Sequence, residues 1–367
     1  MSKGEATITG YADAAGAIPT TPLVVPAYVN GFPVRYIGEN AFKGNTMLRT
    51  VIFCNGIANI GASALEGCNS ITKVEFPGSI QSIGTGAFRG CSCLTEIRIP
   101  DGVTTIQARA FSGCEMLCSV VLSSNTKYIG ESAFEGCVRL SDIAFENFAF
   151  IGNRAFYGCV DLADVVFSDV IESIGSYAFA GCTGLTDITI PKSMQNIGLG
   201  AFANCTSLTG IVLPFTGATA DGKSSTHFGY IFGASSYSYN GNYIPGSLKK
   251  IVITGTRIGD YAFYRYEGLT DFTIPDNIES IGSHAFDGCT GLTIFTIPNS
   301  VKNIELGAFA NCTSLTSITL PFVGATADST DKTHFGYIFG ASGYSDNKKY
   351  IPSSLKKVVL TGGTSID

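Results

Sequence analysis

Cysteine is the chemically reactive residue that recurs most regularly in this chain of 367 residues. Nine of the twelve cysteines occupy one position of a repeated phrase: Cys68, Cys91, Cys114, Cys137, Cys159, Cys182, Cys205, Cys289 and Cys312. Thiols on neighbouring repeats could form disulfides or a ladder of metal ligands. Asn45 and Tyr266 stand at the same position, and Cys54, Cys93 and Cys118 have no ligand spacing with a histidine. We interpret the column as small buried side chains and predict neither a metal nor a cofactor.

The histidines His227, His284 and His334 give little support for catalysis. His227 and His334 could pair with Asp221 and Asp328 in a hydrolytic arrangement, but no nucleophile motif accompanies them. The fragment GLGAFA at 198–203 matches a dinucleotide-binding pattern but lacks the strand and helix that such a site needs. We therefore predict that the protein is not an enzyme.

Aspartates form a column on the outward side of the predicted strands. Asp142, Asp164 and Asp187 are successive members, and Asp271 occupies the same position further on. Stacked about 5 Å apart, such carboxylates repel one another and raise one another's pKa. The strip could hold a calcium ion or a basic peptide, or it could be a hydrated acidic face. The neighbouring outward column is rich in valine, including Val121, Val166, Val212 and Val252, which indicates an interaction surface.

Tyrosines gather in two related segments. The phrase HFGYIFG occurs at 227–233 and again, 107 residues later, at 334–340, and a Tyr-rich stretch follows each copy. Tyrosine with Ser, Gly and Asn is typical of adaptable binding loops. We expect Phe232 and Phe339 to be buried, and we predict that Tyr237, Tyr239 and Tyr344 are exposed and contact a ligand.

A short repeat must position all these residues. The phrases SIGTGAFRGC at 82–91, SIGSYAFAGC at 173–182 and SIGSHAFDGC at 280–289 belong to units of mostly 23 residues. In the unit at 94–116, Leu94, Ile97 and Ile99 alternate with Glu96 and Arg98, which predicts a half-buried strand. One unit cannot bury its apolar residues alone, so the period predicts a solenoid of stacked units.

The phrase IGxxAFxGCxxLxxIxIP resembles the leucine-rich repeats of BspA-like surface proteins of bacteria and protists, from Ala6 to Thr361. The resemblance implies a strand-dominated α/β repeat solenoid, a right-handed curved stack of about 13 turns with a parallel sheet on its concave face. We expect a capping turn at 1–36 and one continuous solenoid domain at 37–367, with elongated turns at 214–250 and 321–357. We expect no targeting signal or anchor in this chain, and we expect it to be a segment of a longer protein or to shield its last strand against another molecule.

The resemblance also implies a location and a partner. It implies a protein at the cell surface or secreted, used for adhesion to a protein or glycan on another cell or on the matrix. The alternative is a structural spacer with no ligand of its own. A net charge of −6 argues against nucleic acid, and the absence of a long apolar run argues against membrane insertion.

Overall fold

The computed structural model describes residues 4–10, 22–145, 147–222, 225–270, 272–327 and 334–362. The chain divides into two compact units. The first unit comprises Met1–Leu185 with Asn204–Thr206, and the second comprises Thr186–Ala203 with Ser207–Asp367.

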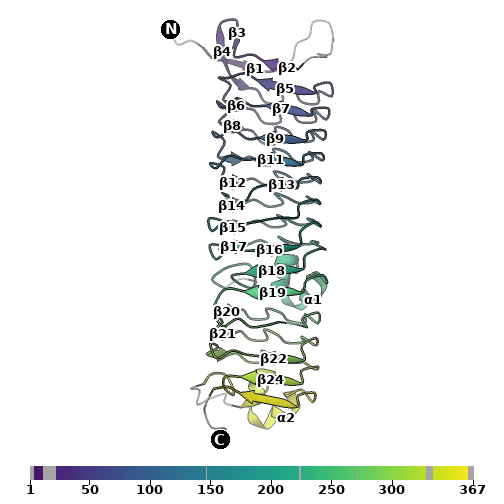
Figure 1. The fold of residues 1–367 in the computed structure, drawn as a ribbon, viewed down its shortest axis with the longest axis vertical. Helices are drawn as coiled ribbons and strands as arrows, with labels where there is room; N and C mark the ends of the chain where they lie inside the picture. Colours follow the sequence, from purple (N-terminus) through teal and green to yellow (C-terminus); the bar gives the residue numbers. More distant parts are fainter. Residues whose placement is uncertain are drawn as a thin grey trace. The chain divides into compact units, whose positions relative to one another are not determined.

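Short strands form two rows in the first unit (Figure 1). The first strand row is made of β2 (Leu23–Val25), β5 (Thr50–Phe53), β7 (Lys73–Glu75), β9 (Glu96–Arg98), β11 (Ser119–Val121) and β13 (Asp142–Ile143). The second strand row contains β1 (Ala6–Ile8), β4 (Phe32–Ile37), β6 (Asn59–Ile60), β8 (Ser82–Ile83), β10 (Thr105–Ile106), β12 (Tyr128–Ile129), β14 (Phe150–Ile151) and β15 (Ser173–Ile174). Neighbouring strands that pair within either row are parallel to each other. In addition, β3 (Tyr28–Val29) pairs with β4 in antiparallel fashion.

Alternation of apolar and polar residues sets the strand register, as the sequence predicts. Val120 of β11 lies between Ile97 of β9 and Ile143 of β13, and all three side chains are buried. Their neighbours Ser119 and Asp142 lie on the opposite side of the same strands. The outward side of the first strand row is called the strand face below.

A third row of backbone hydrogen bonds joins the turns that follow the second strand row. The amide of Phe111 donates to Ala133 O at 2.8 Å, and the amide of Phe134 donates to Ala155 O at 2.8 Å. The glycine of each Ile-Gly pair allows this close stacking, because a Cβ on Gly130 would lie 2.7 Å from the amide nitrogen of Ala108. Arg109 adopts a positive φ of 56°, a conformation that costs a non-glycine residue about 1 kcal/mol.

Phenylalanine rings form the centre of the first unit. Phe88, Phe111, Phe134, Phe156 and Phe179 stack nearly parallel, with centroids 5.3–5.5 Å apart and interplanar angles of 6–10°. Each ring belongs to a separate repeat, and each is completely buried. The ladder therefore couples these five repeats to one another through a shared apolar interior.

The second unit repeats this plan of short parallel strands, and most of its strands form sheets of three. Its strands are β16 (Asp187–Thr189), β17 (Asn196–Ile197), β18 (Gly210–Leu213), β19 (Lys250–Ile253), β20 (Arg257–Ile258), β21 (Ser280–Ile281), β22 (Ile294–Thr296), β23 (Asn303–Ile304), β24 (Ser317–Leu320) and β25 (Lys357–Leu360). β16-β18-β19, β22-β24-β25 and β20-β21-β23 each form a parallel sheet.

Two related inserts interrupt the regular repeat in the second unit. The first insert contains η1 (Phe228–Phe232), η2 (Tyr237–Tyr239) and α1 (Asn240–Tyr243), and the second contains η3 (Phe335–Phe339), η4 (Tyr344–Asp346) and α2 (Asn347–Tyr350). Phe232 and Phe339 are buried, as expected.

Part of the first insert takes the place of an ordinary repeat rung. Thr219 forms an antiparallel bridge with Asn196 of β17, and the amide of Ile197 donates to Ala218 O at 2.8 Å. The amide of Phe228 donates to Ala262 O at 2.8 Å, so η1 continues the row of turns. These parts of the expected elongated turn at 214–250 therefore supply stacking hydrogen bonds by a path that differs from that of the regular repeat.

Candidate interaction surfaces

The strand face of the first unit carries a groove with a volume of about 620 Å³. Strands β7, β9 and β11 form it, together with the turns that contain Phe76 and Pro100. Its apolar lining includes Val121, and its charged lining residues are Lys73, Glu75, Glu96, Arg98 and Asp101. Protein-binding sites combine apolar surface with a polar rim, and the lining of this groove contains both apolar and polar residues.

The predicted aspartate column is exposed where the structure describes it. Asp142 accepts a 2.7 Å hydrogen bond from Ser119 Oγ on the neighbouring strand, and Asp164 is exposed in the same unit. Asp187 is exposed in the second unit, where its carboxylate lies over Gly210. Asp271 lies outside the described residues. The described ranges contain no group of three or more His, Cys, Asp or Glu residues placed to hold a metal ion.

The apolar column beside the aspartates contains strongly exposed side chains. Val166 is 73% exposed in the first unit, and Val121 is exposed at the edge of the groove. In the second unit Ile294, a member of the aspartate column, is 69% exposed. Exposed apolar side chains on a strand surface favour contact with another molecule.

The predicted tyrosines differ in their surroundings. Tyr237 is 36% exposed and stacks on Tyr261 with centroids 4.1 Å apart, while Tyr264 meets it edge-on at 5.1 Å. Tyr239 is exposed, and Tyr344 is 81% exposed. Tyr237 therefore anchors the first insert to the following repeat, whereas Tyr239 and Tyr344 present most of their surface to solvent.

Residues that the sequence does not place beside Tyr237 complete the tyrosine cluster. Tyr261 stacks on His284 with centroids 5.2 Å apart, and His284 Nδ1 lies 2.8 Å from an Asp287 carboxylate oxygen. The Arg265 guanidinium lies 5.4 Å from the centre of the Tyr264 ring. Tyr261 and His284 occupy the same repeat position 23 residues apart, which is the one sequence signal that could have revealed the stack.

The histidines of the inserts have amide partners. His227 Nδ1 lies 2.9 Å from Asn240 Oδ1, and burial lowers the His227 pKa while this hydrogen bond opposes the shift. His334 Nδ1 and Asn347 Oδ1 are also 2.9 Å apart. Asp221 instead accepts a 2.7 Å hydrogen bond from Thr219 Oγ1, and Asp328 lies outside the described residues. The sequence suggests aspartates as partners of these histidines, whereas the structure gives them Asn240 and Asn347.

The nine column cysteines are buried, and all twelve cysteines are free thiols. Their thiols donate to carbonyl oxygens of neighbouring repeats, as Cys114 Sγ does to Phe88 O at 3.2 Å. Burial raises the pKa of Cys68 to about 11 and the pKa of Cys205 and of Cys312 to about 12. Because the thiolate is the reactive form of cysteine, a buried thiol with such a raised pKa contributes to packing and does not act as a nucleophile.

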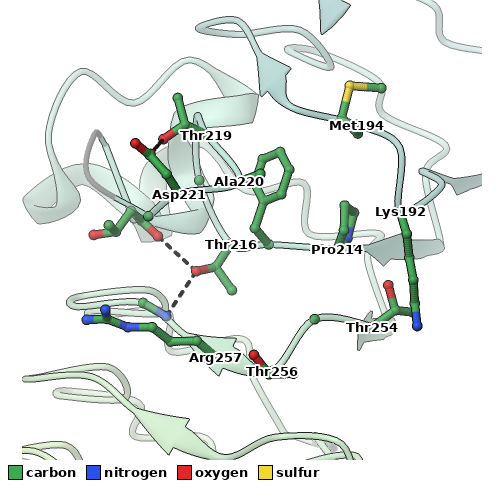
Figure 2. Close-up of a pocket in the computed structure, with 16 residues that line it drawn as sticks. Lys192, Met194, Pro214, Thr216, Thr219, Ala220, Asp221, Thr254, Thr256 and Arg257 are labelled. Atoms are coloured by element: carbon green, nitrogen blue, oxygen red, sulfur yellow. Dashed lines mark hydrogen bonds between the residues drawn. The ribbon is translucent and has the colours of Figure 1, made fainter. Parts of the chain in front are cut away.

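A separate pocket of about 370 Å³ lies beside the first insert in the second unit (Figure 2). Its lining comes from segments 192–194, 214–222 and 254–259 and from Thr226. Figure 2 shows Lys192 and Thr254 on one side and Thr219 and Asp221 on the other, with Thr216 between them. Thr216 Oγ1 donates to Thr226 O at 3.0 Å and accepts from the Gly259 amide at 3.2 Å, which fixes the insert against the next repeat.

A family model for the BspA-type leucine-rich repeat region matches residues 31–141, 110–224 and 243–335. The chain belongs to the BspA-type leucine-rich repeat family. The sequence-based prediction of family and fold is therefore confirmed, and leucine-rich repeat proteins of this kind are generally non-enzymatic and interact with proteins.

Solved structures of other leucine-rich repeat proteins are similar to this chain. A protein from Bacteroides ovatus ATCC 8483 is 24% identical, with a TM-score of 0.55, over 92% of this chain and 82% of that one. A leucine-rich cell surface protein from Faecalibacterium prausnitzii A2-165 is 24% identical over 99% of this chain and 92% of that one, with a TM-score of 0.46. A protein from T. pallidum is 26% identical over 51% of this chain and 77% of that one, with a TM-score of 0.39.

Two further comparisons give negative results. Curated protein sequences give no match to this leucine-rich repeat chain. In the part of the chain that the structure describes, none of the helices has the length and apolar character needed to cross a lipid bilayer.

Proposed function

We propose that the protein is a non-enzymatic interaction protein that binds a protein or glycan on another cell or on the matrix. The groove on the strand face is the observation that carries this proposal. With about 620 Å³ of space, it lies within the range of about 300–1,000 Å³ that is typical of ligand sites.

The lining of the groove favours a protein segment. Lys73 Nζ and Glu75 Oε1 are 2.7 Å apart, so these two charges largely satisfy each other. Arg98 and Glu96 are exposed and form no ion pair among the described residues, and Val121 offers apolar surface next to them. A peptide that carries an acidic and an apolar side chain close together would match Arg98 and Val121.

The tyrosines of the inserts form a separate proposed binding surface in the second unit. Tyr239 and Tyr344 can stack on a partner and donate a hydroxyl hydrogen bond at little entropic cost, because tyrosine has only two side-chain torsions. We also propose that the protein acts at a cell surface or after secretion, and family membership supports this location.

Binding to arrayed matrix proteins and glycans tests the proposal. The double variant Arg98→Glu/Val121→Asp should weaken binding of a captured partner at least tenfold, because it reverses one charge and places a carboxylate on the apolar surface. Arg139→Glu is the matched control, since Arg139 is an exposed arginine of the same unit that does not line the groove.

The tyrosines are tested separately. The triple variant Tyr237→Ala/Tyr239→Ala/Tyr344→Ala should also weaken binding, and the pair Tyr239→Ala/Tyr344→Ala removes the exposed rings without disturbing the Tyr237–Tyr261 stack. Unchanged affinity in the groove variant and in both tyrosine variants would refute the proposed surface. An array without any captured partner would favour the spacer function.

A further inference from the structure

One boundary between repeats of the first unit lacks the strand pairing that joins its neighbours. In the first strand row, β2, β5 and β7 form one sheet, and β9, β11 and β13 form another. In the second strand row, the pairing likewise stops between β8 and β10. Both interruptions fall between the repeats at 71–93 and 94–116, all of whose residues the structure describes. We call this place the open boundary.

Backbone amides of the first strand row show what the open boundary lacks. At the preceding boundary, the amide of Thr72 donates to Arg49 O at 2.8 Å. At the following boundary, the amide of Cys118 donates to Thr95 O at 2.9 Å. The amide of Thr95 stands at the same repeat position, but it donates no hydrogen bond to any described residue. The open boundary therefore lacks a hydrogen bond that is present on either side of it.

The second strand row has the same defect. The amide of Gln81 donates to Ala58 O at 2.7 Å at the preceding boundary. The amide of Lys127 donates to Thr104 O at 2.9 Å at the following one. Between them, the amide of Thr104 has no such acceptor among the described residues. Two separate rows thus lose their hydrogen bonds at one boundary, which indicates that these two repeats are less tightly joined than their neighbours.

The corner between the two strand rows also lacks a bridge at the open boundary. Ser79 Oγ donates to Ile57 O at 2.7 Å at the preceding corner. Asn125 Nδ2 donates to Asp101 O at 3.0 Å at the following corner. Gly102 occupies the same repeat position, and a glycine has no side chain to form such a bond. The sequence therefore removes a side-chain hydrogen bond at the boundary that lacks the backbone ones.

The row of turns holds the open boundary together. The amide of Phe88 donates to Ala110 O at 2.8 Å, and the amide of Gly90 donates to Ser112 O at 2.7 Å. The rings of Phe88 and Phe111 remain stacked, with centroids 5.4 Å apart. Because the two repeats are fastened along the turns and not along the strand rows, the turns can act as a hinge. Regions with few hydrogen bonds open at a low free energy.

The groove on the strand face lies at the open boundary. β7 and β9 both line it, and its lining includes Val74 and Ile97, which are buried. The groove therefore reaches down between the two unpaired strands. Any change in the separation of β7 and β9 changes the width of the groove.

Charges of opposite sign stand at matching positions of the two strands. Lys73 and Glu96 share one repeat position, and Glu75 and Arg98 share another. Lys73 Nζ lies 2.7 Å from Glu75 Oε1 on its own strand, and no ion pair joins β7 to β9 among the described residues. If the strands approach to the usual spacing of about 4.8 Å, both positions bring opposite charges face to face, which stabilises neighbouring strands.

We infer that the open boundary is a joint that opens and closes the groove, with the row of turns as its hinge. In the closed conformation β7 and β9 pair, Lys73 faces Glu96, and Glu75 faces Arg98. In the open conformation, which the structure shows, the groove is accessible and Arg98 has no acidic partner among the described residues. This inference goes beyond the proposed function, because it describes the protein without any partner.

Amide hydrogen exchange, resolved to single residues by NMR or mass spectrometry, tests the open conformation. After correction for intrinsic rates, the amide of Thr95 should exchange at least about tenfold faster than the hydrogen-bonded amide of Cys118. The same difference is expected between Thr104 and Lys127. All four residues are exposed, so exposure does not account for the difference. Equal exchange rates within each pair would overturn the inference.

A zero-length cross-link tests the closed conformation. A water-soluble carbodiimide joins an ammonium group to a carboxylate when the two are in contact. Lys43 Nζ and Glu66 Oε2 lie 3.1 Å apart and serve as the reaction control. We expect a cross-link between Lys73 and Glu96, identified by mass spectrometry, and about tenfold slower exchange of the Thr95 amide in the linked protein.

Glu96→Gln is the matched control variant, because it cannot form this link. Its Thr95 exchange should therefore be the same before and after treatment with the carbodiimide. Absence of the Lys73–Glu96 link from wild-type protein in which the control link forms would also overturn the inference. Unchanged exchange at Thr95 in the linked protein would do the same.

Discussion

Replacing Phe134 by alanine removes one ring from the middle of the phenylalanine ladder. The ring is completely buried and stacks on Phe111 at 5.5 Å and on Phe156 at 5.4 Å. Truncating a buried phenylalanine to alanine costs about 3–5 kcal/mol. Each stacked aromatic pair contributes about 0.5–1.5 kcal/mol beyond burial. Because Phe134 loses two such pairs, we expect a cost in the upper part of that 3–5 kcal/mol range, at about 4–5 kcal/mol.

The damage should be local, because a repeat contacts its nearest neighbours only. Cys114, Cys137 and Cys159 lie in the mutated repeat and the two beside it, and all three thiols are buried. Cys312 is a buried thiol of the second unit and serves as the internal control. If labelling requires local opening, a cost of about 4 kcal/mol accelerates it about a thousandfold, at 1.4 kcal/mol per factor of ten.

Two measurements check this prediction. Urea unfolding followed by circular dichroism gives the loss of stability, and mass spectrometry of alkylated native protein gives the labelling rate of each thiol. Val138→Ala is the control variant, since Val138 is exposed in the same repeat and should change stability by less than about 0.5 kcal/mol. A cost below about 1 kcal/mol for Phe134→Ala, or equal acceleration at Cys137 and Cys312, would refute the ladder as the source of coupling.

Three further predictions concern the column thiols and the inserts. Native protein should be alkylated rapidly at the exposed Cys93 and Cys118 and slowly at the nine column cysteines. Unfolded protein should show twelve reactive thiols by mass spectrometry. Rapid labelling of the column cysteines in native protein would contradict their burial. Burial lowers the folded-state pKa of His227 below the unfolded value of about 6.5, so the unfolded chain binds the proton more readily and stability should fall as pH drops from about 7 to 5. Urea titrations at each pH should show this loss in the wild type and a smaller one in His227→Gln, and identical pH profiles would exclude His227 as its source. Asn240→Ala should cost about 2–4 kcal/mol, because Asn240 is fully buried and its amide bridges Gly229 N and Ala262 O. Asn347→Ala, at a half-buried position, should cost less by the same unfolding measurement, and equal costs would show that burial does not set the difference.

The regular part of the fold could be predicted from the sequence because each repeat presents the same packing problem. The alternation around Ile97 fixes which residues face inward, and the recurrence of Phe111 and Phe134 every 23 residues places their rings in contact. The exposure of Asp142 and Val166 follows from the same alternation. These contacts can be inferred from the sequence alone, because equivalent residues of neighbouring repeats lie next to one another.

The inserts could not be predicted in this way because their path departs from the period. The Tyr237–Tyr261 stack depends on how η2 folds back on the following repeat, and 24 residues separate its members. Asn240 has no counterpart in the ordinary repeat, so nothing in the period marks it as the partner of His227. The pocket at Lys192 and the groove at Phe76 and Pro100 likewise arise from turns, whose spacing the strand pattern does not specify.

Hydrogen–deuterium exchange with and without a partner captured on the array tests the proposed binding surface most directly. The account predicts protection of β7, β9 and β11 at 73–75, 96–98 and 119–121, with little change in the turns at 86–90 and 109–113. Protection confined to those turns, with the three strands unchanged, would contradict it.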